Sequence, residues 1–222
     1  MTTEHHIVVQ RTARYVTIGE ASAATTELWI VCHGYGQLAR PFVASFEAIA
    51  SPSRLIVAPE ALSRFYLERS ATGVNTQAAI GATWMTREDR EHEIVDQIAY
   101  LDALHDHVRP AGNPHRVRLR VLGFSQGVAT VGRWIARGRA HVDELIVWAG
   151  AFPPDVDLTV LRDRLAGAPV VFVVGERDEL APWAAADAQL QRFTDAGIQA
   201  RLVLFEGGHR LDYGTLAALA EE

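Results

Sequence analysis

The chain contains 222 residues, of which 49% are apolar and 22% are charged, and its formal net charge at pH 7 is −6. This length fits one α/β domain spanning residues 1–222 and leaves little for a second, and the apolar share is enough for a large core. The acidic balance, without a basic stripe, argues against a nucleic-acid partner. The single cysteine, Cys32, lies in an apolar run, so we expect a buried thiol and no intrachain disulfide.

The N-terminal end shows no targeting pattern. Its first six residues are polar and lack the apolar core of a secretory signal peptide, and no apolar run is long enough to span a bilayer. We therefore expect a soluble, cytoplasmic protein without a membrane span. His5 and His6 lie in this polar end, which we interpret as a frayed terminus rather than a metal site.

The predicted elements alternate between strands and helices. Two short β-like segments, 7–9 and 15–18, are compatible with an antiparallel pair at a sheet edge. Continuous apolar runs, typical of strands covered on both faces, follow at 28–32, 55–58, 145–148, 170–174 and 200–205. Helical patterns are clearest at 88–108, 128–137, 182–196 and 211–221, and Thr86 with Asp89 resembles a capping box before the longest of them. This alternation predicts a mostly parallel, doubly wound α/β sheet with helices on both faces.

Two segments depart from this simple pattern. In the predicted strand 117–122, Arg116, Arg118 and Arg120 alternate with apolar residues. We expect the first two near the solvated lower end of the sheet, whereas Arg120 would need a carboxylate partner. The stretch 59–85 is rich in small and polar residues and has no clear pattern, and unpatterned loops of this length are often functional.

The most informative segment is 123–127, G-F-S-Q-G, which has the G-x-S-x-G pattern of a nucleophile elbow. A predicted strand precedes it and a predicted helix follows it, which is the context that this motif requires. The glycines leave room for a tight turn that lifts the Ser125 hydroxyl to the top of the sheet, above the N-terminus of the next helix. Ser125 is therefore the candidate nucleophile.

A serine nucleophile needs a histidine base and a carboxylate that orients the base. In hydrolases with this elbow, the chain order is serine, acid, histidine. Asp178 follows the predicted strand 170–174 and His209 follows 200–205, so both lie at the carboxyl ends of strands, where open α/β sheets build their sites. We assign Asp178 as the acid and His209 as the base. Glu176 is a nearby competitor for the role of the acid, and the alternative is that Glu176 is only a solvated turn residue.

A fourth signal follows the predicted strand 28–32. Residues 33–36 read H-G-Y-G, a pattern whose loop contributes one N–H group to an oxyanion hole. We assign the two oxyanion donors to the backbone N–H groups of Tyr35 and Gln126. His33 is expected to shape this loop through hydrogen bonds rather than to act in catalysis.

Together these segments resemble the phospholipase/carboxylesterase family, which includes acyl-protein thioesterases and small bacterial carboxylesterases. The chain matches the family's H-G-x-G, its G-F-S-Q-G, its acid segment D-x-x-V-P with Ala181 in place of valine, and its final G-H at 208–209. The resemblance covers roughly residues 28–214. It implies an α/β-hydrolase fold and hydrolysis of carboxylic esters or thioesters without a cofactor. The stretch 59–85 does not resemble the family's substrate-binding loop.

Five residues are candidates for lining an acyl pocket, with ordinary core or loop packing as the alternative for each: Phe65, Tyr66, Trp84, Met85 and Trp183. The function that we predict is a serine carboxylesterase acting on a small-molecule ester through an acyl-enzyme on Ser125. An acyl-thioesterase, a peptidase that would use Glu60 or Glu68 to bind an amino terminus, and a non-catalytic binding protein of the same fold are the alternatives. No metal site is expected, and a homodimer is compatible with the sequence.

Overall fold

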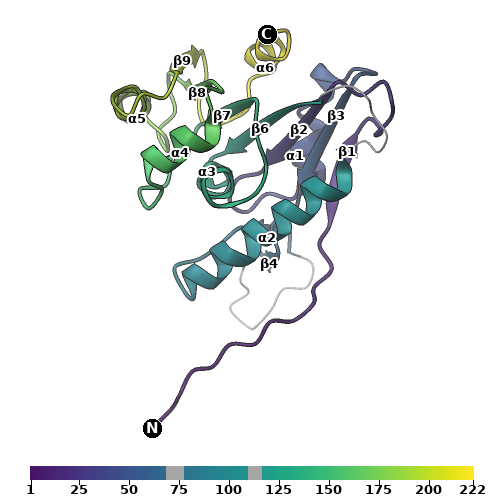
Figure 1. Ribbon diagram of the computed structural model, residues 1–222, viewed down its shortest axis with the longest axis vertical. Helices are drawn as coiled ribbons and strands as arrows, with labels where there is room; N and C mark the ends of the chain where they lie inside the picture. The colour runs from purple at the N-terminus through teal and green to yellow at the C-terminus, as the bar shows by residue number, and fades with distance from the viewer. Residues whose placement is uncertain (69–77, 110–116) are drawn as a thin grey trace.

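The computed structural model describes residues 1–68, 78–109 and 117–222, and its main feature is a central β-sheet (Figure 1). Within those residues the sheet has seven strands in the order β1-β3-β2-β6-β7-β8-β9. β1 pairs antiparallel with β3, and every other neighbouring pair is parallel. The strands are β1 (Tyr15–Ile18), β2 (Glu27–Cys32), β3 (Arg54–Pro59), β6 (Arg118–Phe124), β7 (Glu144–Trp148), β8 (Val170–Gly175) and β9 (Ala200–Phe205).

Helices cover both faces of this sheet, as the sequence predicts. One face carries α2 (Arg90–Val108), α3 (Gln126–Arg137), α4 (Leu158–Leu165) and α5 (Trp183–Asp195). The other carries α1 (Ala39–Ala44), the short 3₁₀ helix η1 (Glu47–Ile49) and α6 (Tyr213–Ala220). In β2, Leu28, Ile30 and Cys32 join the first core, while Trp29 and Val31 join the second. Each fully buried large apolar side chain contributes about 1.5–3 kcal/mol to the stability of the fold, so both cores stabilise the strands that carry the site.

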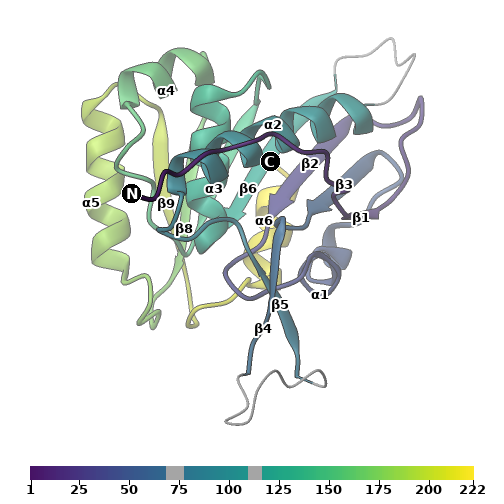
Figure 2. The same cartoon turned by 90° about the horizontal axis from the view of Figure 1, so that it is seen from below.

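A second, small sheet lies outside the central one. β4 (Ser63–Tyr66) and β5 (Ile80–Thr83) form an antiparallel hairpin that projects from the body of the molecule (Figure 2). The sequence predicts no strand within the stretch 59–85, because each of these strands is only four residues long and neither is a continuous apolar run. Residues 69–77 of that stretch lie outside the described residues.

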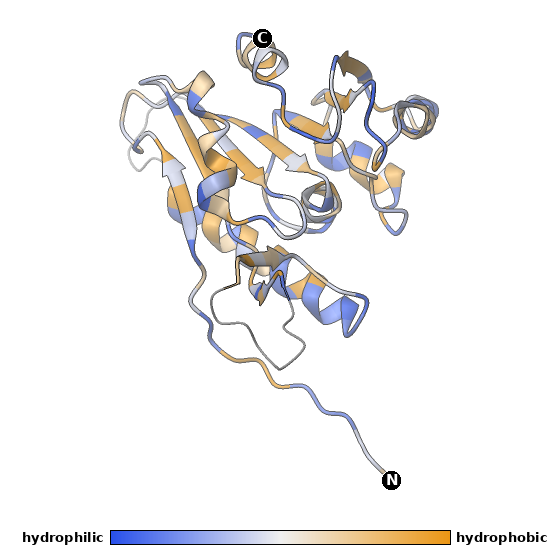
Figure 3. Cartoon of the chain, turned by 180° about the vertical axis from the view of Figure 1, so that it is seen from behind, coloured by the Kyte–Doolittle hydropathy of each residue, from blue (hydrophilic) through white to orange (hydrophobic). Residues whose placement is uncertain are grey.

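Two local predictions are wrong, one in the N-terminal arm and one just before α2. Residues 7–9 form no strand, and Ile7, Val8 and Val9 are all highly exposed on an arm that runs away from the sheet (Figure 3). A β-like composition is not enough where no neighbouring strand offers backbone partners. The capping box at Thr86 and Asp89 is also absent: α2 begins after Asp89, whose side chain accepts no backbone N–H of the helix and instead contacts the rings of His92 and His6.

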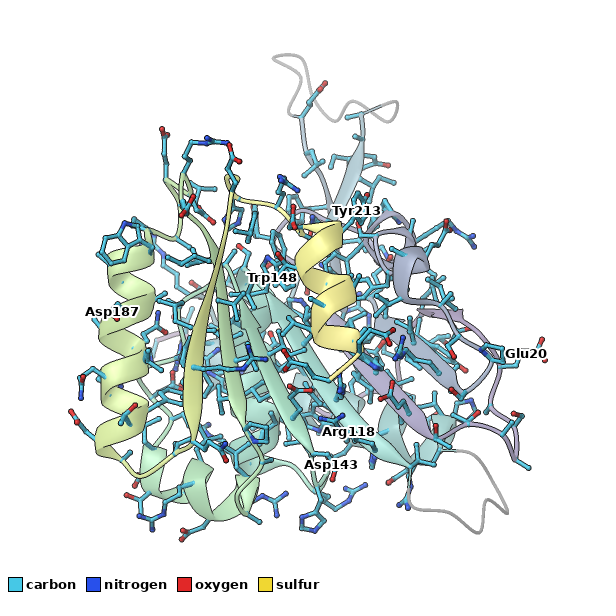
Figure 4. All side chains as sticks on the ribbon, turned by 90° about the horizontal axis from the view of Figure 1, so that it is seen from above. Glu20, Arg118, Asp143, Trp148, Asp187 and Tyr213 are labelled. Carbon is cyan, nitrogen blue, oxygen red and sulfur yellow. The ribbon has the colours of Figure 1, made fainter. Side chains whose placement is uncertain are left out.

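The arginine-bearing strand β6 behaves as expected. Arg120 is fully buried, its Nε lies 3.0 Å from Glu144 Oε2, and its guanidinium packs over the Trp29 ring. Burial raises the pKa of Glu144, against the opposing effect of Arg120. Arg118 lies at the start of the strand, at the opposite end of the molecule from Tyr213 (Figure 4). Arg116 lies outside the described residues.

None of the helices in the described ranges combines the length and the apolar character needed to cross a membrane.

Candidate active site

The candidate nucleophile lies in a strained turn. Ser125 connects β6 to α3 with φ 53° and ψ −116°, a backbone region that costs a non-glycine residue about 1–3 kcal/mol. Its N–H donates to the Trp148 carbonyl of the neighbouring strand at 2.9 Å, which holds the turn in place. The side chain is half-buried and is therefore accessible at the carboxyl end of the sheet.

Glycines make this turn sterically feasible. A Cβ atom at Gly127 would lie 2.2 Å from the Cys32 carbonyl oxygen, and one at Gly123 would lie 2.6 Å from the Gly127 carbonyl oxygen. Across the turn, a Cβ at Gly150 would lie 2.5 Å from the Ser125 carbonyl oxygen. All three distances are below any real Cβ contact, so the elbow requires glycine at these positions. The third of these glycines was not found from the sequence.

The predicted acid and base form a hydrogen-bonded pair. His209 Nδ1 lies 2.9 Å from Asp178 Oδ2. The other carboxylate oxygen accepts the N–H groups of Leu180 and Ala181 at 2.9 and 2.8 Å, and the Asp178 side chain is fully buried. A carboxylate that receives the Nδ1 proton leaves Nε2 as the basic nitrogen of the ring. The competing residue Glu176 is exposed and makes no hydrogen bond to His209.

Ser125 and His209 line one cavity of about 330 Å³. The ring of Phe124, the residue before the serine, packs 5.0 Å from the imidazole centroid. No hydrogen bond joins Ser125 Oγ to His209 in the described structure, and such contacts often shorten only when substrate is bound.

The loop after β2 passes directly beside the nucleophile. A Cβ at Gly34 would lie 3.2 Å from Ser125 Cβ. The loop is held by the Gln37 side chain, which accepts the Gly34 N–H at 2.8 Å, and by the Gly36 N–H, which donates to the Ala82 carbonyl at 2.9 Å. The N–H groups of Tyr35 and Gln126 donate to no other described residue, so both remain available to an oxyanion.

His33 has the supporting place that the sequence predicts. It is fully buried, its Nδ1 lies 2.7 Å from the Gly34 carbonyl, and its Nε2 accepts the Ala61 N–H at 3.1 Å. Because Nε2 is the acceptor, the ring is neutral with its proton on Nδ1. Burial lowers the pKa of His33, against smaller opposing effects of the Gly34 carbonyl and Glu60.

One contact of the elbow was not anticipated. The Gln126 side chain accepts the Trp84 N–H at 3.1 Å and donates to the Met85 carbonyl at 3.0 Å and to Thr83 Oγ1 at 2.9 Å. The residue that offers a predicted oxyanion N–H is thus tied to the end of the β4–β5 hairpin. Only the glutamine of the G-F-S-Q-G motif hints at this contact in the sequence, because its partners are about 40 positions away.

The walls of this cavity are mainly apolar. They come from the carboxyl ends of β7 and β8, from α3 and from the start of α5, and the lining residues other than Ser125 and His209 are Gln126, Ala129, Val147, Ala149, Gly150, Ala151, Phe172, Val173, Val174, Leu180, Ala181, Pro182, Ala185, Ala186 and Gln189. None of the five residues predicted to bind substrate is among them. Their role in substrate binding stays a prediction.

The structure places those five residues as follows. Trp84 is buried and donates from Nε1 to the His33 carbonyl at 2.8 Å, and Met85 Sδ accepts from Arg133 at 3.3 Å. Phe65 packs against Tyr35, while Tyr66 is exposed on the hairpin. Trp183 is half exposed and directly follows the cavity residues 180–182.

A second cavity, of about 560 Å³, lies on another side of His209. It is enclosed by the loop after β2, α1, β5 and the segment that leads into α6, and its lining residues other than His209 are Gly36, Gln37, Leu38, Pro41, Phe42, Ser45, Ile80, Phe124, Arg210, Leu211 and Tyr213. His209 is the one residue common to both cavities.

Of the two N-terminal histidines, His6 is not simply frayed. His6 stacks on His92 with ring centroids 3.9 Å apart, and its Nε2 lies 3.2 Å from Asp89 Oδ2. Among the described residues this is the grouping of potential metal ligands close enough to share an ion, and all three residues are exposed. One nitrogen of each ring lies against an oxygen of the Asp89 carboxylate, and the absence of a metal site here stays a prediction.

Comparison with known proteins bears on the family and the fold of this chain. The sequence pattern of the family described as serine hydrolase (FSH1) matches residues 30–211, whereas no curated protein sequence matches the chain. Similar solved structures include esterase PE8, at 22% identity and a TM-score of 0.68 over 95% of this chain and 97% of that one. Acyl-protein thioesterase 2 of Zea mays has 15% identity and a TM-score of 0.68 over 95% and 97%. A carboxylesterase from Mesorhizobium loti has 17% identity and a TM-score of 0.67 over 94% and 93%.

At these identities the structural likeness shows the fold alone, which is the α/β-hydrolase fold. The resemblance to esterases and acyl-protein thioesterases that the motifs predict is confirmed at this level. The family pattern covers well over half of the chain, and the protein therefore belongs to the serine hydrolase (FSH1) family.

Proposed function

We propose that this serine hydrolase is a carboxylesterase that cleaves small-molecule esters through an acyl-enzyme on Ser125. The observation that carries the proposal is the Asp178–His209 pair at 2.9 Å, whose histidine shares a cavity with a serine in a strained elbow. A serine hydroxyl is a weak nucleophile by itself, and this arrangement is the one that activates it.

Each group then has a role that follows from its position. Ser125 Oγ attacks the ester carbonyl while His209 Nε2 takes its proton, and Asp178 stabilises the imidazolium that forms. The N–H groups of Tyr35 and Gln126 donate to the developing oxyanion. His209 then returns the proton to the departing alcohol, which leaves the acyl group on Ser125. A water molecule, deprotonated by His209, attacks the acyl-enzyme, and His209 returns that proton to Ser125 Oγ as the acid is released.

The first cavity suits the acyl group of such a substrate. It contains Ser125 itself, and the walls contributed by β7, β8 and α5 are apolar. Its volume of about 330 Å³ lies at the lower end of the 300–1,000 Å³ of ordinary ligand pockets, so short and medium acyl groups fit better than long lipids.

The alternatives differ in what supports them. A thioesterase would use the same groups, so the structure favours neither ester nor thioester. A peptidase that binds an amino terminus through Glu60 is disfavoured, because the Glu60 side chain is buried and already accepts bonds from Arg14, Arg64 and the Ala39 N–H. The cytoplasmic location and a homodimer stay predictions.

Two measurements test the proposal. The wild-type protein should be labelled covalently by a fluorophosphonate probe, and the Ser125→Ala variant should not. A panel of esters, thioesters and amides of graded acyl length should show ester turnover well above amide turnover, with kcat/KM declining for the longest chains. Absence of labelling, or amide turnover equal to ester turnover, would refute the proposal.

A further inference from the structure

The second cavity has no role in the chemistry described so far. Among the described residues it shares only His209 with the first cavity, and its volume is about 560 Å³ against 330 Å³. The N-terminal end of α6 forms one of its borders, where Figure 4 labels Tyr213 at the same end of the molecule as the hairpin. An open space beside the proposed general acid calls for an explanation in terms of substrate.

The direction of proton transfer supplies that explanation. In ester cleavage, His209 must deliver a proton to the oxygen or sulfur of the leaving group, so the leaving group lies against the imidazole. The acyl group is attached to Ser125, which lines the first cavity and not the second. We infer that the second cavity binds the alcohol or thiol part of the substrate, an inference that rests on the proposed esterase function.

The lining of the second cavity indicates the chemical class of this leaving group. Leu38, Phe42 and Phe124 provide an apolar surface for its body. The side-chain Nε2 of Gln37 and the hydroxyl of Ser45 have no hydrogen-bond partner within the described part of the chain, so both can bind polar groups on it. The leaving group is therefore amphipathic, with an apolar body that carries hydroxyl, ether or carbonyl groups.

Charge narrows the class further. Arg210 borders the cavity, but its Nη1 lies 2.9 Å from Asp212 Oδ1 and its Nη2 donates to the Glu206 carbonyl at 3.2 Å. Its charge is thus compensated within the protein, and none of the described lining residues is acidic. The cavity fits an uncharged alcohol or thiol, and its volume leaves room for a leaving group as large as a phenylpropyl alcohol.

Two matched variants test this division of the substrate. Ser45→Phe narrows the second cavity at a residue with ordinary helical φ and ψ, and Ala185→Phe narrows the first at an exposed position of α5. The substrates are acetate and hexanoate esters of ethanol and of 3-phenylpropan-1-ol. Ser45→Phe should lower kcat/KM about tenfold or more for the phenylpropyl esters and less than about twofold for the ethyl esters. Ala185→Phe should instead lower kcat/KM more for the hexanoate esters than for the acetate esters, whichever alcohol they carry.

Deacylation gives a readout that is independent of folding yield. Once the alcohol has left, every ester of one acid passes through the same acyl-enzyme, so Ser45→Phe should leave the rate of deacylation unchanged. With wild-type protein, added 3-phenylpropan-1-ol should intercept the acyl-enzyme far better than ethanol does and give the new ester. Equal losses on ethyl and phenylpropyl esters, or equal interception by the two alcohols, would overturn the inference while fluorophosphonate labelling and ester turnover still upheld the proposed function.

Discussion

The two sides of the active site are built by different means. On one side, the nucleophile, acid and base each lie within a few residues of the end of a strand, at 123–127, 175–182 and 207–209. Backbone geometry fixes this strand-end side, through glycines that allow close approach and through short hydrogen bonds between adjacent chain segments. Its residues therefore form compact sequence motifs.

On the other side, the described parts of 59–85 and the N-terminal arm are held by side chains that reach across long sequence distances. Gln126 binds three consecutive residues of the hairpin end. The Glu60 carboxylate accepts hydrogen bonds from Arg14 of the arm and from Arg64 of the hairpin, each at 2.7 Å. Burial alone would raise the pKa of Glu60, yet the hydrogen bonds from Arg14 and Arg64 bring it below its usual value. This hairpin side carries no compact motif.

The difference predicts how substitutions on the two sides should affect turnover. If the strand-end side carries the reacting groups and the hairpin side only positions them, substitutions on the strand-end side should abolish turnover. Substitutions on the hairpin side should lower the turnover rate without abolishing it.

The largest effect is expected for the proposed triad. Ser125→Ala, His209→Ala and Asp178→Asn should each lower kcat on the order of 10⁴- to 10⁶-fold, and combining them should add little because the three act as one unit. Glu176→Gln removes an exposed carboxylate two residues from the acid and serves as the matched control, with activity close to wild type. Steady-state kinetics on a short-chain ester would decide the matter, and more than about a tenth of wild-type activity in Ser125→Ala would refute the assignment.

The next effect is on stability. Gly127→Ala would place a Cβ 2.2 Å from the Cys32 carbonyl oxygen, so the elbow must distort, and the free energy of unfolding should fall by about 3 kcal/mol. Gly214→Ala is the control, because this residue lies in α6 with its nearest neighbour 3.5 Å from the added Cβ, and alanine favours a helix by about 0.5–1 kcal/mol. Urea unfolding of the two variants should give shifts of opposite sign. Equal stability of both would mean that the elbow is not sterically constrained.

On the hairpin side, Gln126→Met should keep the shape of the side chain and lose its hydrogen bonds to residues 83–85. The Gln126 N–H then loses its fixed orientation, and we expect kcat to fall about 10- to 100-fold with little change in KM, since oxyanion stabilisation acts in the transition state. Gln191→Met, on the exposed face of α5, is the matched control. A rise in KM with unchanged kcat would instead assign Gln126 to ground-state binding.

His33 connects the two sides, and its effect is set by pH. Burial lowers the pKa of His33 in the folded protein. In the unfolded chain this histidine takes up a proton near pH 6.5, its ordinary pKa, whereas in the folded chain it stays neutral to a lower pH. The stability is therefore full above that pH and declines as the pH falls below it. His33→Gln should remove this component, so the free energy of unfolding of the wild type should approach that of the variant between about pH 7.5 and 5.5. A constant difference over this range would contradict a neutral His33.

The same comparison explains what the sequence could predict. The parallel sheet and the helices α2, α3, α5 and α6 follow from apolar runs and helical spacing, and Asp178 and His209 meet as expected because each follows its own strand. The hairpin was missed because its pairing joins residues separated by the stretch 67–79, and no local pattern records that pairing. The cavity walls were missed for a related reason: small side chains such as Ala185 line them, and these look like ordinary helix residues in the sequence.

The smallest effect should come from Trp183, the predicted substrate-binding residue that lies next in the chain to cavity residues. Leu180, Ala181 and Pro182 line the first cavity, and the half-exposed indole follows them at the start of α5, which places it at the rim rather than inside. An acetyl group should not reach it, whereas a longer acyl chain should contact it as it leaves the cavity. Trp183→Ala should thus raise KM about two- to fivefold for octanoate esters and leave acetate esters unchanged, as a partly exposed apolar contact is worth about 1 kcal/mol or less. A comparable rise in KM for acetate esters would place Trp183 inside the first cavity rather than at its rim.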